Sequence, residues 1–404
     1  MNISEIRKDF PALSQIVNNN RLIYFDNAAT AMKPQTVIDA VSDYYSTINS
    51  NVHRAGHYLS AQATLAYENA RQNIADFINA NESSEIIFTK GTTESINFLA
   101  EVLNKEILKT GDEVILTRME HHSNIVPWVD IKKNKDIKIK IIEIDHKGNL
   151  ILDSINDIIT DKTKILSITH SSNVLGTINP IDKLIKLAKS RGVVTIIDGA
   201  QAIVHEKVDV QQLDCDFYCF SGHKLYAPMG IGVIYGKMKF LKNLNPYQKG
   251  GGMINKVSFD SVTYNSPPYR FEAGTPNVSG AIGLSKAIDY ISNIGLDIIK
   301  EQEQKLLAYG TEKLNEIDDL FIFGQSCDKD PIISFAINGI HPMDLSMILD
   351  KLGVASRSGT HCTQPLFEKL NVSSNTRISF AFYNTLEEID TFVEGLIKAV
   401  NLLK

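Results

Sequence analysis

The chain has 404 residues, a length that exceeds one small domain and predicts either two domains or one large α/β domain with an appendage. Its formal net charge of −6 argues against non-specific binding to nucleic acid, and polar residues interrupt the apolar runs well short of a membrane span. The N-terminal residues lack the apolar core of a secretory signal, and the four cysteines suggest no disulfide framework. We therefore expect a protein of the reducing cytoplasm.

The first part of the chain predicts a helical start, a short strand and two longer helices. The expected elements are a helix-then-loop region over residues 1–20, a strand over 21–25, and helices over 34–47 and 60–79. The segment DNAAT follows the strand, and its small side chains permit close approach of a ligand or another chain. A polar loop with His53 and Arg54 separates the two helices, and a solvated connection explains its composition equally well.

From Glu85 onward, predicted strands alternate with predicted helices. Strands are expected over residues 86–89, 113–116, 138–144, 164–169, 193–197, 214–220 and 233–235, and helices over 91–108 and 181–191. Near-continuous apolar strands in this order predict a mainly parallel sheet that helices cover on both faces. In such sheets ligands bind beyond the carboxyl ends of the strands, where this chain has its polar clusters.

The C-terminal part predicts a long irregular segment and then a smaller α+β domain. Residues 245–276 are rich in Gly, Pro, Asn and Ser, and an irregular segment of this length in a compact enzyme is usually functional. Later elements are expected as helices over 278–294, 297–317, 343–352 and 386–403, and as strands over 332–336 and 376–382. The predicted organisation is a large α/β domain over residues 21–279 and a small domain over 1–20 and 280–404.

Lys224 directly follows the predicted strand over residues 214–220 and stands in a loop with Ser221 and His223. A partly desolvated lysine loses its proton more easily and can form a Schiff base as a nucleophile. A solvated surface residue is the ordinary explanation for a lysine taken alone. The polar groups at the other strand ends favour the reactive interpretation.

Other strand ends carry groups that suit a phosphorylated ring cofactor. Thr92 and Thr93 begin a helix whose backbone N–H groups and dipole suit a phosphate, although threonine is also a common N-cap. Asp198 can hold a proton on a ring nitrogen or cap a turn, and His121 can stack on a ring, ligate a metal or stand exposed. Together with Lys224, these groups match the demands of pyridoxal phosphate.

The cysteines differ in their expected surroundings. Cys215 and Cys219 fall on a predicted strand without a second pair of ligands, so buried core positions are favoured over a metal site. Cys362 lies in a polar segment whose Gly and Pro predict a loop. Positive charge from the neighbouring Arg357 and His361 favours the thiolate, which is the nucleophilic form of cysteine.

Eight motifs along nearly the whole chain occur together in the order of one known family. They are YFDNAAT (24–30), NVHR (51–54), GTTESIN (91–97), EHHSNIVPW (120–128), DGAQ (198–201), SGHK (221–224), YRFEAGTP (269–276) and RSGTHC (357–362). In these motifs the chain resembles the pyridoxal-phosphate-dependent cysteine desulfurases of the Suf type, in the class V aminotransferase superfamily of fold type I. The resemblance implies a large α/β domain with a mainly parallel sheet of the seven-stranded type, plus a smaller α+β domain.

The resemblance implies a cofactor site for pyridoxal 5′-phosphate. By this analogy Lys224 holds the cofactor as a Schiff base, Asp198 pairs with its ring nitrogen, and His121 stacks on its ring. The other cofactor-binding residues that it implies are Thr92, Thr93, Asn173, Gln201, Ser221 and His223, with Thr275 contributed by the other subunit of a homodimer.

The same resemblance implies a substrate site and a sulfur-accepting thiol. The implied substrate-binding residues are Arg377, Asn173, Arg357, His53 and Arg54. Arg377 would grip the carboxylate of L-cysteine, and Cys362 would accept its sulfur. Family members often have two histidines before this cysteine, and Thr360 replaces the first of them here, a departure that bears on proton transfer in the loop.

These observations favour an L-cysteine desulfurase that releases L-alanine, forms a persulfide on Cys362 and passes the sulfur to a Suf-type acceptor protein for iron–sulfur cluster assembly. The alternatives are a selenocysteine lyase, an aminotransferase or epimerase without sulfur chemistry, and a non-catalytic scaffold for sulfur-transfer partners. The presence of Lys224 and Asp198 argues against the scaffold. Neither nucleic acid, nor a membrane, nor a metal is expected as a partner of the chain.

Overall fold

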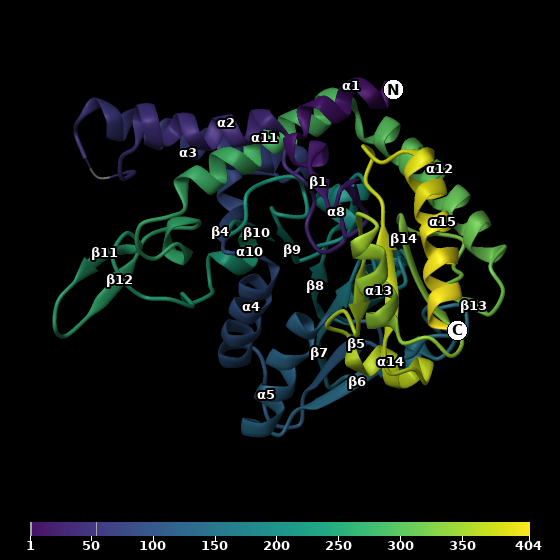
Figure 1. The fold of residues 1–404 in the computed structure, drawn as a ribbon. Coiled ribbons are helices and arrows are strands. Elements are labelled where there is room, and N and C mark those ends of the chain that lie inside the picture. Colours follow the sequence, from purple (N-terminus) through teal and green to yellow (C-terminus); the bar gives the residue numbers. More distant parts are fainter. Residues whose placement is uncertain (1, 54) are drawn as a thin grey trace.

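The computed structural model describes residues 2–53 and 55–404, and its centre is a seven-stranded sheet (Figure 1). Across the sheet the strands are β4 (Ile86–Thr89), β10 (Gly232–Gly236), β9 (Phe217–Ser221), β8 (Val194–Asp198), β7 (Thr163–Thr169), β5 (Glu113–Thr117) and β6 (Lys138–Ile142). The strand β10 runs antiparallel to both neighbours, and the other pairs are parallel. The predicted mainly parallel sheet is confirmed, and six strands direct their carboxyl ends to one edge.

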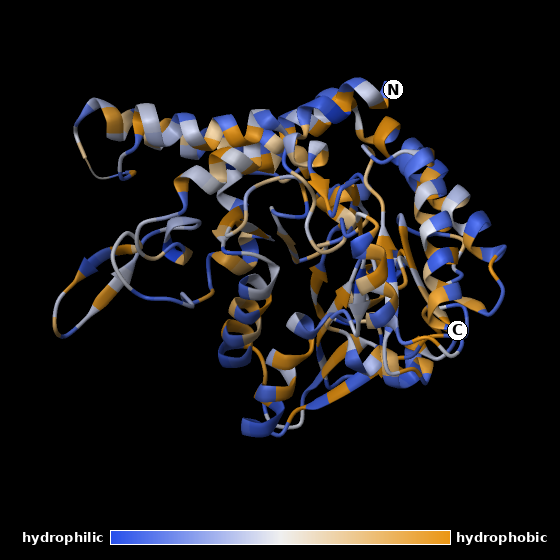
Figure 2. Cartoon of the chain, viewed as in Figure 1, coloured by the Kyte–Doolittle hydropathy of each residue, from blue (hydrophilic) through white to orange (hydrophobic). Residues whose placement is uncertain are grey.

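Helices cover both faces of this sheet because side chains alternate between the faces along each strand. Ile196 packs in a core with Leu99 and Trp128, whereas the next residue, Ile197, packs in another core with Leu184. The helices that contribute to these cores are α3 (Tyr58–Phe77), α4 (Thr92–Glu106), α5 (Val126–Asn134), α7 (Ile181–Ser190) and α11 (Val278–Ile294). Figure 2 shows hydrophobic residues on the central strands and a mixture of both kinds on the surrounding helices.

A second sheet has four antiparallel strands. Its order is β13 (Leu320–Phe323), β14 (Ile332–Ile337), β17 (Asn375–Ser379) and β16 (Arg357–Gly359). The helices α12 (Leu296–Asn315), α13 (Pro342–Lys351) and α15 (Leu386–Leu403) contribute to one apolar core with its strands. The helix α15 begins in a capping box, in which Thr385 and Glu388 each accept the backbone N–H of the other.

The N-terminal segment joins this second sheet. The strand β3 (Ile23–Tyr24) pairs in parallel with β15 (Val354–Ala355), and a single further bridge links Asp26 to Ser379 in β17. The segment after β3 is thereby held beside the strands that carry Arg357 and Arg377. The division into two domains at residues 20 and 279 stays a prediction.

Several segments differ from the sequence prediction, among them α5 and β13, which it did not include. Residues 357–359, expected within a loop, form β16, which pairs Arg357 with Arg377 of β17. The segment over 245–276, expected to be irregular, contains the antiparallel hairpin of β11 (Ile254–Val257) and β12 (Val262–Tyr264). The strand expected over 21–25 is divided between two short strands, β2 and β3. The strand β16 is polar, and its hydrogen bonds come from a partner distant in sequence, so no local pattern marks it.

The remaining elements are short. They are α1 (Ile3–Ile6), β1 (Ile16–Val17), β2 (Asn20–Arg21), α2 (Gln35–Asp43), α6 (Ile155–Ile158), α8 (Ala202–His205), α9 (Val210–Leu213), α10 (Met238–Leu241) and α14 (Gln364–Leu370), with a π-helical turn at Tyr44–Ile48. The 3₁₀ turns are Arg7–Asp9, Pro11–Ser14, Ser83–Glu85, His122–Asn124 and Tyr269–Phe271. Within the described residues, none of the helices has both the length and the hydropathy that a bilayer span requires.

Candidate active site

A cavity of ≈ 290 Å³ lies at the edge where the parallel strands of the large sheet end. The lining residues at or after these strand ends are Thr92, Thr93, His121, Ser123, Thr169, Ser171, Asn173, Asp198, Ala200, Gln201, Ser221, His223 and Lys224. The N-terminal segment and the second sheet with its adjoining turn contribute Ala28, Ala29, Arg357, His361, Cys362 and Arg377. The structure therefore brings together most of the residues that the sequence singled out.

The beginning of α4 forms a cradle for an anion. Gly91 has φ +155°, and a Cβ on Gly232 would lie 2.4 Å from the Gly91 Cα. The close approach of these two backbone segments therefore requires glycine. The Thr92 N–H donates to Ser221 Oγ at 2.8 Å, and the two hydroxyl oxygens also lie 2.8 Å apart. The buried Nδ1 of His223 has no hydrogen-bond partner among the described residues. Hydroxyls and a helix N-terminus together suit a phosphate.

Lys224 lines this cavity, and the pKa of its ammonium group is below the ordinary lysine value. Burial is the main cause that lowers the pKa of its ammonium to about 8; Asp198 acts against this shift, and Arg377 adds to it. A lysine with this pKa is partly in the neutral amine form near neutral pH. It can therefore act as a nucleophile toward a carbonyl group.

The loop of Lys224 is fastened to the N-terminal segment. The carbonyl oxygen of His223 accepts hydrogen bonds from the Ala31 N–H at 3.2 Å, the Thr30 hydroxyl at 3.1 Å and Lys33 Nζ at 2.8 Å. Burial lowers the pKa of Lys33 to about 8. The sequence alone gave Lys33 no role, because no local pattern distinguishes it from a surface lysine.

Asp198 ends β8 and is buried at the floor of the site. Its Oδ1 accepts the N–H of Ala200 at 3.0 Å. Burial raises the pKa of Asp198, while this N–H and the charge of Lys224 oppose the rise. A protonated ring nitrogen beside this carboxylate would favour its charged form. Gln201, which follows closely, donates from Nε2 to the Ala28 carbonyl at 2.8 Å.

His121 is held as a neutral imidazole. Its Nδ1 accepts the backbone N–H of Ser123 at 3.1 Å and lies 2.8 Å from the hydroxyl of the same residue. Burial, followed by the charge of Lys224, lowers the pKa of His121 to about 4. Because Nδ1 is an acceptor, the ring proton is assigned to Nε2. A flat neutral ring with one N–H is available to the cavity.

Arg377 is buried, and its neighbours use part of its donor capacity. Its Nη1 donates to the Asn173 carbonyl at 2.8 Å and its Nη2 to Asp26 Oδ1 at 3.1 Å, whereas its buried Nε has no partner among the described residues. Burial is the main cause that lowers the pKa of Arg377. The Asn173 side chain donates to the His361 carbonyl at 2.9 Å, so Asn173 connects the guanidinium to the turn of Cys362.

Cys362 lies in the turn between β16 and α14, and its side chain is exposed. The backbone of His361 (φ +47°) and of Cys362 (φ +59°) is left-handed, a conformation that non-glycine residues rarely adopt. The His122 N–H donates to the Cys362 carbonyl at 2.7 Å, and His122 Nε2 accepts the Gln364 N–H at 3.0 Å. These bonds fix a strained turn, as is common at functional sites. The sequence did not assign this role to His122.

His361 is neutral, and the side chain of Asn375 in β17 fixes its ring. Its Nε2 lies 2.7 Å from Asn375 Oδ1. Burial, with the charge of Arg377 next, lowers the pKa of His361 to about 3. Its positive charge, which the sequence analysis invoked to favour the thiolate, is therefore absent near neutral pH. Of the groups named there, Arg357 keeps its charge.

All four cysteines are free in the part of the chain that the structure describes, and they divide into two classes. Cys215 and Cys219 are buried in the sheet, as predicted, and burial raises the pKa of the Cys215 thiol to about 12. Cys327 and Cys362 are exposed, and only Cys362 lines the cavity. Nowhere in the described ranges do three or more His, Cys, Asp or Glu side chains form a group suited to a metal ion.

Two of the sequence-predicted residues that the structure describes lie outside this cavity. His53 and Thr275 line a second cavity of ≈ 540 Å³ with Tyr269 and Glu272, so the structure does not bring them to Lys224. The expectation that Thr275 serves the other subunit of a homodimer stays a prediction. Arg54 lies outside the described residues.

The groups in the first cavity fit pyridoxal phosphate in chemical kind. They combine an anion cradle with an unpartnered His223 Nδ1, an amine of lowered pKa, a buried carboxylate and a neutral imidazole. These are the functions that the phosphate, the aldehyde, the ring nitrogen and the ring face of this cofactor require.

The aminotransferase class-V family matches residues 23–392 of the chain. A cysteine desulfurase of Wigglesworthia glossinidia brevipalpis is 48% identical over 404 residues, which cover 100% of this chain and 98% of that protein. This chain belongs to the cysteine desulfurases of the class-V aminotransferase family. The predicted cysteine desulfurase family, enzyme class and fold class are confirmed, and the assignment to the Suf type stays a prediction.

Solved structures of cysteine desulfurases share the fold along the whole length of the chain. The apo enzyme of Thermococcus onnurineus NA1 is 41% identical, with a TM-score of 0.94 and coverage of 98% of each chain. The S-sulfonic acid form of the cysteine desulfurase CsdA of Escherichia coli is 38% identical, with a TM-score of 0.93 and full coverage of both chains. The desulfurase fold therefore extends over both sheets.

Proposed function

We propose that this cysteine desulfurase binds pyridoxal phosphate at Lys224, takes L-cysteine as substrate and carries its sulfur as a persulfide on Cys362. The observation that carries the proposal is that Lys224, Asp198, Arg377 and Cys362 line one cavity. A structural lysine, a turn-capping aspartate and an ordinary exposed cysteine would have no reason to meet there.

The residues that would hold the cofactor come from separate strand ends. Thr92, Thr93, Ser221 and His223 would bind the phosphate, and Lys224 would bind the aldehyde carbon. Asp198 would face the ring nitrogen, His121 the ring, and Gln201 the ring hydroxyl. When bound, pyridoxal phosphate supplies an electron sink for bonds at the α carbon of an amino acid.

The protein side chains bind and orient the amino acid. The buried guanidinium of Arg377 has the planar donor geometry that pairs with a carboxylate, and its unpartnered Nε is free to donate. Lys224 Nζ, with its pKa near 8, can accept and return a proton close to neutral pH. His121 keeps Nε2–H as a donor because Ser123 occupies Nδ1.

Cys362 takes the sulfur. Its thiolate attacks the substrate sulfur, an S–S bond forms, and the C–S bond breaks with its electron pair remaining on carbon. After protonation that carbon is the methyl group of L-alanine. The exposed position of Cys362 leaves the persulfide accessible to a protein thiol of an acceptor.

The proposal extends to the oligomeric state, the sulfur-acceptor protein and the cellular location. We expect a homodimer in which Thr275 of one subunit completes the phosphate site of the other. We expect a Suf-type acceptor protein, a role in iron–sulfur cluster assembly and a cytoplasmic location. The exposed turn of Cys362 supports a protein acceptor, since an acceptor thiol must reach the persulfide directly.

One set of assays tests the proposed reaction. L-Alanine release is measured from L-cysteine, from L-selenocysteine, and from alanine-forming transamination with a keto acid. We expect rapid release from L-cysteine only with a thiol acceptor, and mass spectrometry should find one added sulfur on the peptide of Cys362. Release confined to selenocysteine would instead establish a lyase, and transamination without persulfide would refute the sulfur chemistry.

A further inference from the structure

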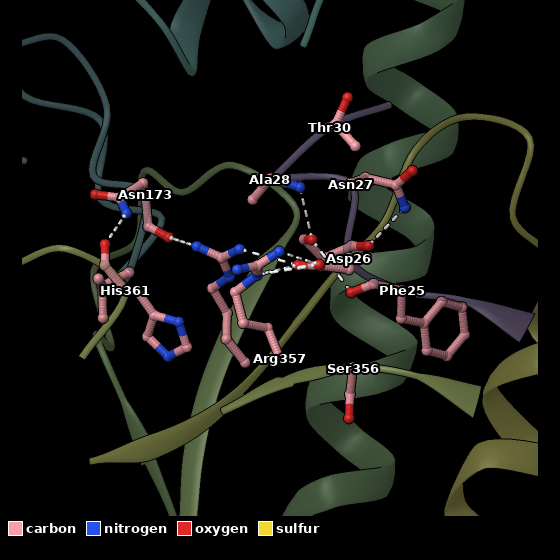
Figure 3. Close-up of polar contacts among 12 residues, drawn as sticks. Phe25, Asp26, Asn27, Ala28, Thr30, Asn173, Ser356, Arg357 and His361 are labelled. Atoms are coloured by element: carbon pink, nitrogen blue, oxygen red, sulfur yellow. Dashed lines mark hydrogen bonds and ion pairs between the residues drawn. The ribbon is translucent and has the colours of Figure 1, made fainter. Parts of the chain in front are cut away.

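Asp26 joins the two arginines of the cavity through one carboxylate (Figure 3). Arg357 Nε lies 3.0 Å from each carboxylate oxygen, and its Nη2 lies 2.8 Å from Oδ2. Arg377 Nη2 reaches Oδ1 at 3.1 Å. Two guanidinium groups therefore share one carboxylate, and the three side chains together carry one net positive charge.

This arrangement offsets a repulsion between two positive charges in the second sheet. Arg357 and Arg377 are directly paired residues of antiparallel β16 and β17, and like charges in such a pair repel each other. Water screens this repulsion only weakly, because Arg377 is only 2% exposed. Asp26 offsets it: its carboxylate raises the pKa of Arg357 and opposes the effect of burial on the pKa of Arg377.

The backbone around Asp26 is fixed on both sides. The Phe25 N–H donates to the Ala355 carbonyl at 3.0 Å, and the Ser379 N–H donates to the Phe25 carbonyl at 2.7 Å. The Ala28 N–H donates to Ser379 Oγ at 2.8 Å. The backbone before Asp26 is thus held between β15, which precedes Arg357 in the chain, and β17, which carries Arg377.

We infer that Asp26 is a positioning residue for recognition of the substrate carboxylate. It orients both guanidiniums and leaves the pair with a single uncompensated positive charge. The buried Nε of Arg377 remains a donor without a hydrogen-bond partner in the part of the chain that the structure describes. A ligand with one carboxylate satisfies that charge, and an amine without a carboxylate does not.

The inference rests on the proposed function for the identity of the ligand as an amino acid. The main test uses D26N in the holoenzyme, because asparagine keeps the size of the side chain and removes its charge. Dissociation constants are measured for L-alanine and for ethylamine, which lacks the carboxylate, from changes in the visible absorbance of the holoenzyme. This measurement needs no turnover, so its result stands apart from that of the sulfur-transfer assay.

We expect D26N to weaken L-alanine binding by about tenfold, because a neutral asparagine no longer holds the two guanidiniums in the orientation that the carboxylate requires, and to leave ethylamine binding within about twofold. The KM for L-cysteine should rise by a similar factor while kcat changes little.

The control is E388Q, which breaks another partly buried ion pair between the N-terminal segment and the C-terminal part, Arg7–Glu388 at 2.7 Å. It should lower stability and leave the ratio of the two dissociation constants unchanged. Equal weakening of both ligands in D26N, or an unchanged constant for L-alanine, would overturn the inference. If D26N does not fold, the same ratio is measured in D26E, whose longer side chain displaces the guanidiniums; a wild-type ratio there would also overturn it.

Discussion

The backbone N–H of His122 donates a 2.7 Å hydrogen bond to the carbonyl oxygen of Cys362, so the segment that carries the cavity-lining His121 also holds the turn that carries the thiol. The side chain of His122 forms a second hydrogen bond to this region, since its Nε2 accepts the N–H of Gln364 at 3.0 Å. The position of the sulfur acceptor is therefore set by the large sheet as well as by its own strand.

The variant H122F keeps a ring at this position and removes the acceptor for Gln364. We expect turnover of L-cysteine to fall about threefold to tenfold, as for one lost hydrogen bond, while the visible absorbance of the cofactor is retained. Iodoacetamide should label Cys362 faster, because the turn is less constrained. The exposed His146 provides the control H146A, which should change neither quantity, and wild-type turnover in H122F would show that this hydrogen bond has no catalytic consequence.

The variant C362S tests the sulfur acceptor itself. It removes the thiol and keeps the exposed turn, so we expect desulfuration of L-cysteine to fall to background while the cofactor absorbance is unchanged. The matched control is C327S, the other exposed cysteine, which lies outside the cavity and should retain full activity. Added sulfur on the peptide of Cys327, Cys215 or Cys219 in the wild type would contradict this role.

Attachment of pyridoxal phosphate to the apoprotein should depend on the protonation of Lys224. Its ammonium must lose a proton before it attacks the aldehyde, so the rate should rise with pH around a midpoint near 8, and not near the ordinary lysine value of 10.5. Stopped-flow absorbance measures this rate. K224A should show no such attachment, and the exposed-lysine control K249A should behave as wild type. A midpoint above 10 would disprove the lowered pKa.

A buried ion pair outside the active site should make stability depend on pH. His205 Nδ1 lies 2.7 Å from Glu303 Oε2, with both side chains buried. Burial acts to lower the pKa of His205, but Glu303 and then Asp330 outweigh it and raise the pKa to about 9. Because the folded pKa exceeds the unfolded value of 6.5, the stabilisation is complete below pH 6.5 and is lost as pH rises through 9.

Urea unfolding of wild type and H205Q across this range measures the effect. The difference in free energy of unfolding should be at most about 3 kcal/mol below pH 6.5 and should shrink above pH 9. A difference that stays constant from pH 6 to pH 9.5 would show that packing, and not the charge, is what H205Q removes. H146A at the surface serves as the control, with no expected dependence of this kind.

The local sequence pattern was sufficient to predict the long helices and the edge of the large sheet at which the site lies. The helices expected over residues 278–294 and 386–403 have these bounds in the structure, because apolar spacing and capping residues are local signals. Residues far apart in the chain, such as Thr93, Asp198 and Lys224, meet because parallel strands end at one edge, which the β-then-α order already implies. The chemistry of these residues suggested a phosphorylated ring cofactor, and the resemblance to the desulfurases then assigned each of them one role among the alternatives.

Only the tertiary structure decided how the second sheet completes the site. The polar segment Arg357–Gly359 is a strand because β17 supplies its hydrogen bonds, and that pairing sets Arg357 opposite Arg377. Asp26, more than 300 positions earlier in the chain, reaches both guanidiniums only through the pairing of β3 with β15. Ion pairs and hydrogen bonds of such long range leave no periodic trace in a sequence, since they depend on which strands become neighbours. For the same reason the roles of Lys33 and His122 were visible only in the fold.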